Sequence, residues 1–328
     1  MTNNMIIRNN VEVLTYEDAI DQVKKVVDRS LTKSPLLIRE YLSHLSLSQG
    51  KFIRAVSVIV SAQDNEGMVD PNAVNIAAAI EIIHLASLVH DDVIDNAKLR
   101  RGKATLQEKY GKKTAVICGD YLLSLALRMI SDISNKKNYL ELELPDYIGK
   151  LCLGELNQYI NNNNVNLSIF KYLKIISGKT AALFEASFFA GAVMANCSEK
   201  ETIKYKQFGY YIGMIFQLSD DCIDFDTTVE QANKPVQSDY EQGVITLPLI
   251  HAFMQNKKFK EKALEDGITR EEINAEVNKT EGLSFTKLMI QKYYKKAMKR
   301  LDELTLCEDK KEKMVSILNK AARMTPAK

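Results

Sequence analysis

Residues 71–95 read PNAVNIAAAIEIIHLASLVHDDVID, an apolar run of about seven helical turns that ends in three aspartates. Pro71 suits the first turn of a helix, so a helix is expected to open there. Residues 91–95, DDVID, place the first and last carboxylates four positions apart, on one helix face. Like charges at that spacing repel by roughly 0.2–0.5 kcal/mol even when exposed. Burial raises this cost because the carboxylates lose water, so a counter-ion is expected beside them.

The same pattern occurs a second time at residues 220–224, DDCID, after the apolar run 213–219, GMIFQLS. One D-D-x-x-D motif is weak evidence, since acidic solvated faces are common. Both copies here are embedded among Val, Leu, Ile, Phe and Cys rather than Lys and Glu. Mg²⁺ binds through a few carboxylates and usually also binds substrate phosphates. The two motifs therefore predict a site for magnesium and phosphate.

The composition favours a large helical protein. The 328 residues include only 14 Gly and 6 Pro, and 46% are hydrophobic, which favours long helices around a sizeable core. A net charge of +2 argues against nucleic-acid binding. The five Cys are scattered and odd in number, as in reduced cytoplasmic proteins. The most apolar stretches are interrupted by Glu81, Asp120 or Glu185, so no membrane span is expected and a soluble, cytoplasmic protein is predicted.

Helical periodicity continues along nearly the whole chain and predicts a single all-α domain over residues 1–328. Thr15 is a plausible N-cap, and Ser34 and Pro35 suit the N-cap and N1 positions of the next helix. Loops are expected at residues 161–164 and 226–243. Further helices are expected at residues 51–63, 71–91, 114–132, 146–161, 168–177, 179–196, 199–224 and 246–322.

Two basic groups accompany the first aspartate motif. The first group follows the motif directly and consists of Lys98, Arg100, Arg101 and Lys103, with Gly102 allowing a tight turn. Charge balance at a helix C-terminus explains such a group when it stands alone. Beside a carboxylate-metal cluster, however, paired arginines suit a polyphosphate, because they bind phosphate bidentately. The second group is Lys51 and Arg54, expected on one face at a helix start, where an anion is favoured.

Several other residues are ordinary alone and gain meaning from this context. His84 lies two turns before Asp91 on the same face, although a lone His on an apolar helix is usually just packed. Gln217 precedes Asp220 by three positions, so its amide is expected beside the carboxylates. Lys179 and Thr180 open a helix of small and apolar residues, and Lys234 lies in the polar loop after the second motif.

This set of motifs resembles the trans-type isoprenyl (polyprenyl) diphosphate synthases, in particular the long-chain type such as heptaprenyl or octaprenyl diphosphate synthase. The resemblance covers roughly residues 30–255 in order. It rests on GKxxR at 50–54, HxxSLxHDDxxD at 84–95, RRG at 100–102, KT at 179–180 and FQxxDDxxD at 216–224. The resemblance implies a single bundle of antiparallel helices around a central substrate cavity, and usually a homodimer.

The resemblance also implies a role for each matching residue. Mg²⁺, with three ions per active site, would be bound by Asp91, Asp95, Asp220 and Asp224, supported by Asp92 and Asp221. The allylic diphosphate, farnesyl or geranyl diphosphate, would contact Arg100, Lys179 and Lys234. The diphosphate of isopentenyl diphosphate would be held by Lys51, Arg54, His84 and Arg101. Thr180 and Gln217 would line the reacting carbons and, with Lys179, form the catalytic set.

Product length in this family depends on residues below the first motif. A bulky aromatic at the fifth position before it stops growth at short chains; here that position is Ala86, beside the small Ser87. The sequence therefore predicts a long product of about seven to ten isoprene units, as for a quinone side chain, delivered to membranes. Close helix packing is the alternative reason for small residues there. The tunnel floor is expected among large residues of the 114–132 helix, such as Leu123, Leu127 or Met129.

Two positions depart from the family pattern. Val244 replaces a lysine often found before Thr-Leu-Pro, and residues 324–328 do not clearly match the basic C-terminal tail that can close such sites.

Four other functions share features with this sequence pattern. A short-chain synthase and a non-catalytic partner subunit remain alternatives, although such subunits typically lose site residues that this chain keeps. A terpene cyclase normally carries a different second motif, and a di-iron bundle requires Glu and Glu-x-x-His ligands.

Overall fold

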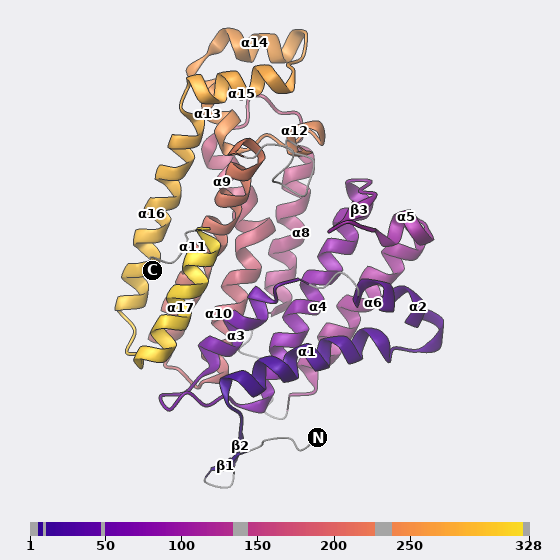
Figure 1. Ribbon diagram of the computed structural model, residues 1–328, viewed down its shortest axis with the longest axis vertical. Coiled ribbons are helices and arrows are strands. Elements are labelled where there is room, and N and C mark those ends of the chain that lie inside the picture. The colour runs from indigo at the N-terminus through magenta and orange to yellow at the C-terminus, as the bar shows by residue number, and fades with distance from the viewer. Residues whose placement is uncertain (1–5, 9–10, 47–49, 134–143, 227–237, 324–328) are drawn as a thin grey trace. The chain divides into compact units, whose positions relative to one another are not determined.

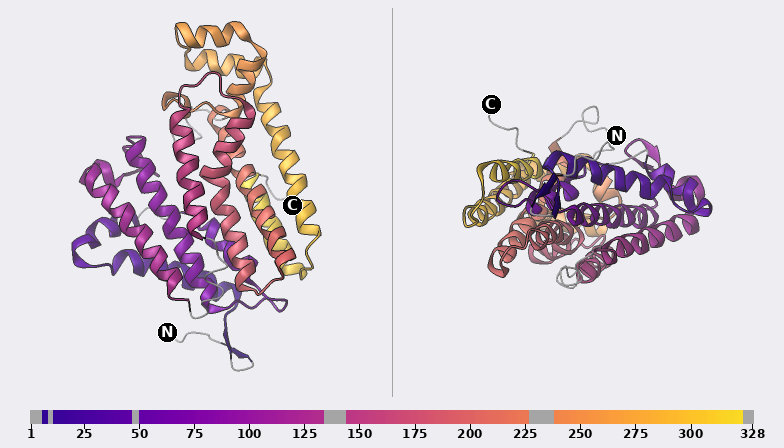
Figure 2. Two further views of the ribbon diagram at one scale, coloured as in Figure 1. Left: turned by 180° about the vertical axis from the view of Figure 1, so that it is seen from behind. Right: turned by 90° about the horizontal axis from the view of Figure 1, so that it is seen from below.

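The computed structural model describes residues 6–8, 11–46, 50–133, 144–226 and 238–323, and these residues are predominantly helical (Figures 1 and 2). The chain forms two compact units. One contains Met1–Leu144, Ala186–Lys206 and Leu304–Ile317. The other contains Pro145–Glu185, Gln207–Glu303 and Leu318–Lys328. The expectation of one domain over residues 1–328 stays a prediction.

The first unit is built around helix α4, Pro71–Ile94, which packs against α1, α3, α5 and α6 (Figure 1). Its residues are buried on several sides, with Ile76, Ile80 and Ala86 fully buried. The helices of this part of the chain are α1 (Tyr16–Thr32), α2 (Leu36–Ser46), α3 (Ile53–Ala62), α5 (Leu106–Tyr110) and α6 (Lys112–Ser131), and α2 packs against α1, α5 and α6. Two small antiparallel sheets consist of β1 (Ile6–Arg8) with β2 (Val11–Val13), and β3 (Leu99–Arg100) with β4 (Lys103–Ala104).

Among the described residues, α4 and α6 are long and apolar enough to cross a membrane by length and hydropathy alone. Burial explains this composition for α4, because 61% of its most apolar stretch is buried inside the protein. In α6 the buried share of the most apolar stretch is 39%, and the exposed apolar residues of this helix include Ile117 and Leu127. Helices in the core of a globular protein are apolar on all sides, and α4 shares this property.

Helix starts in the first unit follow the sequence signals in part. Thr15 caps α1 as predicted, accepting a hydrogen bond from the backbone N–H of Asp18 at 3.1 Å. The prediction for the next helix was wrong by one residue, because α2 begins at Leu36 and the carbonyl of Pro35 accepts its first bonds. Ser34 does not cap α2: its hydroxyl donates to the carbonyl of Leu31, at the end of α1.

The start of α3 also differs from the prediction. The sequence places Lys51 and Arg54 on one helical face, but α3 begins only at Ile53. Phe52 adopts a left-handed conformation, with φ of 52° and ψ of 31°. A bulky residue with positive φ is uncommon, and here it directs Lys51 away from the helix path. Lys51 is therefore an exposed residue outside α3, whereas Arg54 is buried in its first turn.

The second unit contains helices that run before, through and after the second aspartate motif. They are α8 (Leu144–Ile160), α9 (Ile169–Ile176), α11 (Glu199–Asp226), α12 (Ser238–Glu241), α13 (Leu247–Gln255), α14 (Lys257–Glu265), α15 (Arg270–Lys279) and α16 (Gly282–Asp302). Helices α10 (Ala182–Met194), α11 and α17 (Glu308–Ala321) each include residues of both units. Within the second unit, α13 packs against α9, α14, α15 and α16. The predicted loop at 161–164 is confirmed, since α8 ends at Ile160.

Between α9 and α10 the helix widens into one turn of π-helix, Ser177–Ala181. Two glycines allow α8 to approach this turn closely. A Cβ on Gly154 would lie 2.2 Å from the backbone nitrogen of Lys179, and one on Gly178 would lie 2.9 Å from the Cα of Gly154. The sequence predicted two separate helices here, at 168–177 and 179–196, and did not predict the π turn that joins them. Such turns occur frequently at functional sites.

Candidate active site

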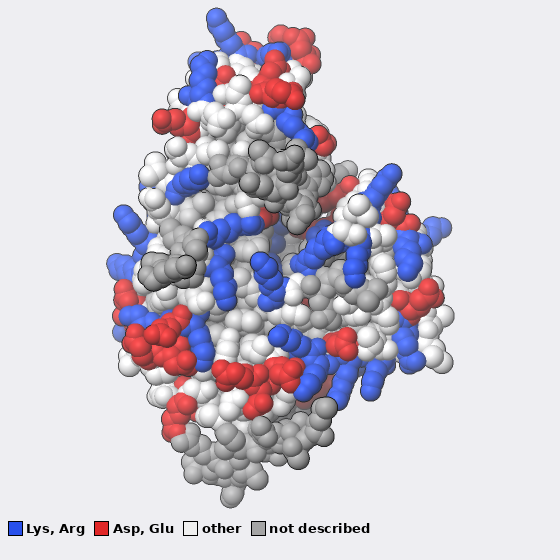
Figure 3. Space-filling model, viewed as in Figure 1, with Lys and Arg blue, Asp and Glu red and all other residues white. Residues whose placement is uncertain are grey.

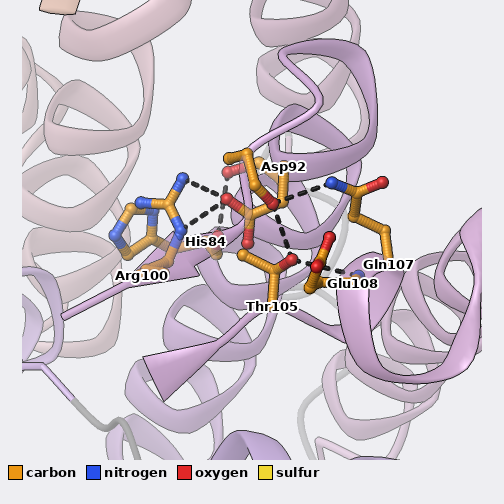
Figure 4. Close-up of polar contacts among 8 residues, drawn as sticks. His84, Asp92, Arg100, Thr105, Gln107 and Glu108 are labelled. Carbon is orange, nitrogen blue, oxygen red and sulfur yellow. Dashed lines mark hydrogen bonds and ion pairs between the residues drawn. The ribbon is translucent and has the colours of Figure 1, made fainter. Parts of the chain in front are cut away.

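The first aspartate motif forms the last turn of α4, and a hairpin folds back onto it. Asp95 is the C-cap and donates its N–H to the carbonyl of Asp91 at 2.8 Å. Asp92 is 7% exposed and accepts two bonds from Arg100, from Nε at 2.8 Å and Nη2 at 2.7 Å (Figure 4). Burial raises the pKa of Asp92, Arg100 opposes that rise and the charge of Asp95 adds to it. Arg100 is thus fixed beside the motif by a charge-assisted interaction.

The hairpin that carries the two arginines consists of β3 and β4. Its central residues, Arg101 and Gly102, both have positive φ, 53° and 75°, as a tight two-residue turn between strands requires. Its base is held by the carbonyl of Ala97, which accepts bonds from Thr105 Oγ1 at 2.7 Å and Gln107 Nε2 at 2.8 Å (Figure 4). The predicted tight turn at Gly102 is confirmed, and it presents the side chain of Arg101 at the surface.

Arg54, His84 and Arg101 form a cationic cluster in the first unit. Burial lowers the pKa of Arg54 to about 10; Glu81 opposes the fall and Arg101 adds to it. Burial also lowers the pKa of His84 well below its usual value, with further lowering by Arg54, Arg101 and Arg100. His84 is therefore a neutral ring that can donate one hydrogen bond. A Cβ on Gly50 would lie 2.9 Å from the guanidinium of Arg101, so a larger residue there would displace this side chain.

Further lysines surround these arginines on the outer surface. Figure 3 shows Lys and Arg side chains gathered over the region where Figure 1 places β3 and α5. The exposed basic residues of this segment are Lys98, Arg101, Lys103, Lys109, Lys112 and Lys113. A concentration of one charge raises the local concentration of an oppositely charged ligand. The arrangement in this unit suits a small polyanion such as a diphosphate.

The second aspartate motif lies on α11, and its middle carboxylate is the most buried. Asp221 is 1% exposed and accepts hydrogen bonds from the hydroxyl of Tyr172 and from Gln217 Nε2, the latter at 2.9 Å. Burial raises the pKa of Asp221 from 3.8 to about 7; these two hydrogen bonds oppose the rise, and the charges of Asp220 and Asp224 add to it. A carboxylate in this position favours a nearby cation.

Gln217 connects this motif to the π turn. Its Oε1 accepts a bond from Thr180 Oγ1 at 2.7 Å while its amide nitrogen donates to Asp221. The chain Thr180, Gln217, Asp221, Tyr172 is therefore continuous within the second unit. Eight regular helical steps would place Tyr172 and Thr180 about 80° apart. The extra residue in the π turn reduces this to about seven effective steps, which brings both side chains to within about 20° of one face.

The outer carboxylates of the second motif have partners as well. Asp220, with 41% of its side chain exposed, is paired with Arg323 of the same unit. Asp224 accepts a bond from the backbone N–H of Asp239 at 3.4 Å. Burial raises the pKa of Asp239 well above its usual value, and the charges of Asp224, Asp221 and Asp220 add to the rise. Four carboxyl groups therefore repel one another in this part of the protein.

Lys179 is held beside the π turn by a carboxylate of α8. Its Nζ lies 2.9 Å from Glu155 Oε2, and both side chains are about four-fifths buried. Glu155 directly follows Gly154, whose missing side chain lets α8 reach the turn. The close approach of α8 thus fixes both the backbone and the side chain of Lys179.

Each aspartate motif offers oxygen donors of the kind that magnesium prefers. In each unit one carboxyl group of the motif, Asp92 or Asp221, has a pKa raised by burial and by neighbouring carboxylates, a cost that a divalent cation would relieve. Within the described residues, no group of three or more His, Cys, Asp or Glu side chains is arranged to hold a metal alone. Mg²⁺ commonly completes its shell with water and substrate phosphate, so diphosphate oxygens would be the remaining ligands.

Comparison with known proteins identifies the family. The family model described as Polyprenyl synthetase matches residues 35–281. The chain belongs to the polyprenyl synthetase family. It is 36% identical over 293 residues to heptaprenyl diphosphate synthase component 2 of Bacillus subtilis (strain 168), covering 88% of this chain and 83% of that one. It is 34% identical over 242 residues to octaprenyl diphosphate synthase of Escherichia coli (strain K12), covering 74% of each chain.

The structural comparison agrees with this polyprenyl synthetase assignment. The crystal structure of heptaprenyl diphosphate synthase from Staphylococcus aureus matches with a TM-score of 0.85 at 31% identity, covering 94% of this chain and 98% of that one. The predicted all-α isoprenoid synthase fold is confirmed, and so is the resemblance stated from the motifs. As a member of this family the chain is an enzyme, a prenyltransferase.

Most predicted site residues of this polyprenyl synthetase lie in described parts of the chain. In the first unit, Arg54, His84 and Arg101 come together, and Arg100 binds Asp92. In the second, Thr180 and Gln217 join the motif. Lys234 lies outside the described residues, as do residues 324–328. Sequence reasoning missed the partners of these residues, namely Glu81, Glu155, Tyr172, Asp239 and Arg323. Glu81 and Tyr172 carried a weak signal, because each is a polar residue within an apolar helical run.

Proposed function

We propose that this chain is an all-trans polyprenyl diphosphate synthase that adds isopentenyl diphosphate repeatedly to an allylic diphosphate, with a long product of about seven to ten units. The allylic primer is farnesyl or geranyl diphosphate. The enzyme acts in the cytoplasm and delivers its product to membranes. Family membership, the basic cluster of the first unit and the names of the hepta- and octaprenyl relatives support this proposal.

Each proposed role follows the family resemblance and suits the chemistry of the side chain. The diphosphate of isopentenyl diphosphate is assigned to the cations Lys51, Arg54 and Arg101 and to the neutral ring of His84, which can donate one hydrogen bond. The allylic diphosphate is assigned to Arg100, Lys179 and Lys234, and the reacting carbons to Thr180 and Gln217. Magnesium, with three ions per active site, is assigned to Asp91, Asp95, Asp220 and Asp224, with Asp92 and Asp221 in support. When bound, Mg²⁺ would neutralise the diphosphate as it leaves.

The reaction requires little more from the protein than binding and orientation. Loss of diphosphate from the allylic substrate leaves a carbocation, which the double bond of isopentenyl diphosphate attacks. A proton is then lost, and the departing diphosphate is a suitable acceptor for it. The arginines hold the diphosphates, and buried apolar residues such as Ile80 and Ile83 exclude water that would otherwise quench the cation. No side-chain general base is assigned.

The observation that carries the product length is the small, buried surface of α4 before the first motif. Ala86 is fully buried and lies five residues before Asp91, and Ser87 turns its hydroxyl onto the carbonyl of His84 at 2.8 Å. Because its hydroxyl is bonded within the helix, Ser87 presents a small surface next to Ala86. A prenyl tail extending along α4 would then pass Ile83 and Ile80, at about one isoprene unit per helical turn.

The test is an incubation with Mg²⁺, labelled isopentenyl diphosphate and farnesyl diphosphate, followed by separation of the products by length. Products of seven to ten units support the proposal. Products that stop at three or four units would support the proposed reaction but would contradict the long-chain assignment, and the enzyme would then be a short-chain synthase. No incorporation by folded protein at saturating Mg²⁺ would contradict an autonomous synthase.

We also propose that two copies associate through α8. Leu153, Leu156 and Ile160 are 65%, 52% and 67% exposed and share one face at spacings of three and four residues. An apolar stripe of this kind on a soluble protein marks an interaction surface. Leu153→Glu is expected to convert the dimer to monomer in sedimentation velocity, whereas Leu288→Glu, at the exposed Leu288 of α16, is not. A native protein that sediments as a monomer would contradict this assignment.

A second candidate assembly has specific support. The Bacillus subtilis relative is named component 2 of its synthase, which indicates that a second component exists for that protein. If the same holds for this chain, the purified protein alone will be inactive, and a second polypeptide will be needed for activity. The chain keeps the aspartates and arginines of the proposed site, so we favour an active homodimer over a non-catalytic partner subunit.

A further inference from the structure

Helix α3 begins without a cap of its own. Phe52 occupies the N-cap position and offers no side-chain hydrogen bond, and its left-handed conformation turns the preceding chain away. The first N–H groups of a helix have no partner within the helix and normally bond to a Ser, Thr, Asp or Asn at the N-cap. Ala55, one of these first residues, needs an acceptor from elsewhere.

Glu81, three residues before His84 on α4, supplies that acceptor. Its Oε1 accepts the backbone N–H of Ala55 at 2.9 Å, and its carboxylate also accepts the backbone N–H of Arg54. These N–H groups are at the second and third helical positions, where a local N-cap side chain would bond. Glu81 thus caps α3 from another helix, and this joins α3 to α4 next to His84.

The same carboxylate lies among positive charges. Arg54 and Arg101 both act electrostatically on Glu81, and Glu81 acts on both in return. Arg100 is occupied by Asp92. Arg54 is only 8% exposed, and a buried guanidinium needs a nearby negative charge to keep its position. The carboxylate of Glu81 supplies this negative charge, and its hydrogen bonds from the backbone of α3 fix its position.

We propose that Glu81 is a positioning residue for the diphosphate of the homoallylic substrate, acting through the backbone and guanidinium of Arg54. The inference rests on the proposed function, since it assigns that diphosphate to Arg54, His84 and Arg101. Glu81 itself repels a diphosphate, so its contribution is orientation, which outweighs the repulsion. Removal of the negative charge of Glu81 is therefore expected to weaken the binding of the anionic diphosphate, which is the opposite of what the charges alone predict.

The experiment is titration calorimetry with isopentenyl diphosphate alone, which does not condense without an allylic partner. Glu81→Ala is expected to weaken this binding at least tenfold and to leave the affinity for farnesyl diphosphate within twofold. The matched control is Asp70→Ala, which removes the N-cap carboxylate of α4 that accepts from Asn72 N–H at 2.7 Å, far along the same helix. That variant is expected to melt at lower temperature and bind both ligands normally.

Two further variants keep the inference falsifiable if Glu81→Ala folds poorly. Glu81→Gln retains an oxygen for Ala55 and loses the charge, and it is expected to weaken binding by about threefold to tenfold; tighter binding would overturn the proposal. In an Arg54→Ala background, Glu81→Gln should have no further effect, whereas an undiminished effect would show that Glu81 does not act through Arg54. If the native protein does not bind isopentenyl diphosphate, the proposed function fails instead.

Discussion

Asp221 is a buried carboxyl group with two hydrogen-bond donors and two acidic neighbours, and its pKa of about 7 makes the stability of the magnesium-free protein depend on pH. Above its unfolded pKa of about 3.8, the folded state keeps a proton that the unfolded state releases. This contribution to stability is fully present below that value and is lost as pH rises to about 7. Bound magnesium would reverse this preference, because a cation favours the charged form.

Asp221→Asn is therefore expected to remove part of this pH dependence. The Tyr172 hydroxyl can turn to accept from the new amide, so both hydrogen bonds can persist. Relative to the native protein, the variant should gain stability on the order of 2 kcal/mol between pH 5 and pH 8. Urea unfolding in chelator at the two pH values measures this gain. Parallel pH profiles for the two proteins would contradict the account.

At Ala86 the prediction concerns the product. Ala86 is fully buried, and under the proposed function Ala86→Phe adds a ring where a growing prenyl chain is expected to pass. Products should shorten to about four units or fewer, with the rate of the first condensation retained. Product analysis by chromatography tests this, and Ala78→Ser on the same helix is a mild control. An unchanged product ladder would show that Ala86 does not line the path of the chain.

The residues that carry charge were predictable, but their partners were not. The aspartate motif and the paired arginines make Asp91, Asp95 and Arg100 recognisable from the sequence alone. Glu81 and Glu155 act through distant backbone and side-chain contacts, at separations of 26 and 24 positions from Ala55 and Lys179. Nothing local in the sequence sets such contacts, because they depend on how helices pack.

At the scale of the element, the close packing of α8 on the π turn gives a direct prediction. Gly154→Ala would place a Cβ 2.2 Å from the backbone nitrogen of Lys179, so the turn has to move. We expect a loss of stability of about 1–3 kcal/mol and lower activity, because Lys179 and Thr180 move with it. Thermal and chemical unfolding, with steady-state rates, measure both effects.

Gly149→Ala is the matched control for that substitution. It lies on the same helix, and a Cβ there meets nothing within 4 Å. Since alanine is the better helix former by about 1 kcal/mol, this variant should be neutral or slightly more stable. Equal destabilisation by both substitutions would mean that helix geometry, rather than the contact with the π turn, accounts for the loss.

Element boundaries followed the sequence where local chemistry decides them. Thr15 and Asp70 cap their helices through their own side chains. The start of α3 and the π turn could not be predicted, because the first depends on Glu81 from α4 and the second on glycines in two separate helices. Periodicity reports which face of a helix is buried and does not identify the hydrogen-bond pattern of a single turn.

At the scale of the whole molecule, repulsion between the carboxylates of each aspartate motif predicts that a bound cation and diphosphate stabilise the folded protein. Mg²⁺ with inorganic pyrophosphate should raise the melting temperature, since binding to the folded state at about 100 times Kd adds roughly 2.7 kcal/mol. Chelator should reverse the shift, and sodium chloride at equal ionic strength should not reproduce it. Differential scanning calorimetry with each addition provides the measurement. Absence of any shift would argue against a metal-diphosphate site.

The π turn has a consequence for how this chain can vary in length. Deleting one residue, for example Ser177, would let α9 and α10 join as an ordinary α-helix, with better backbone geometry and fewer irregular hydrogen bonds. The same deletion would leave seven regular steps between Tyr172 and Thr180, so both side chains would stay within about 20° of one face. Keeping every residue but replacing the π turn by regular α-helix would instead rotate Tyr172 by about 80° from that face and break the line of contacts through Gln217. The extra residue and the wide turn therefore compensate each other, and this helix can lose both together but neither alone.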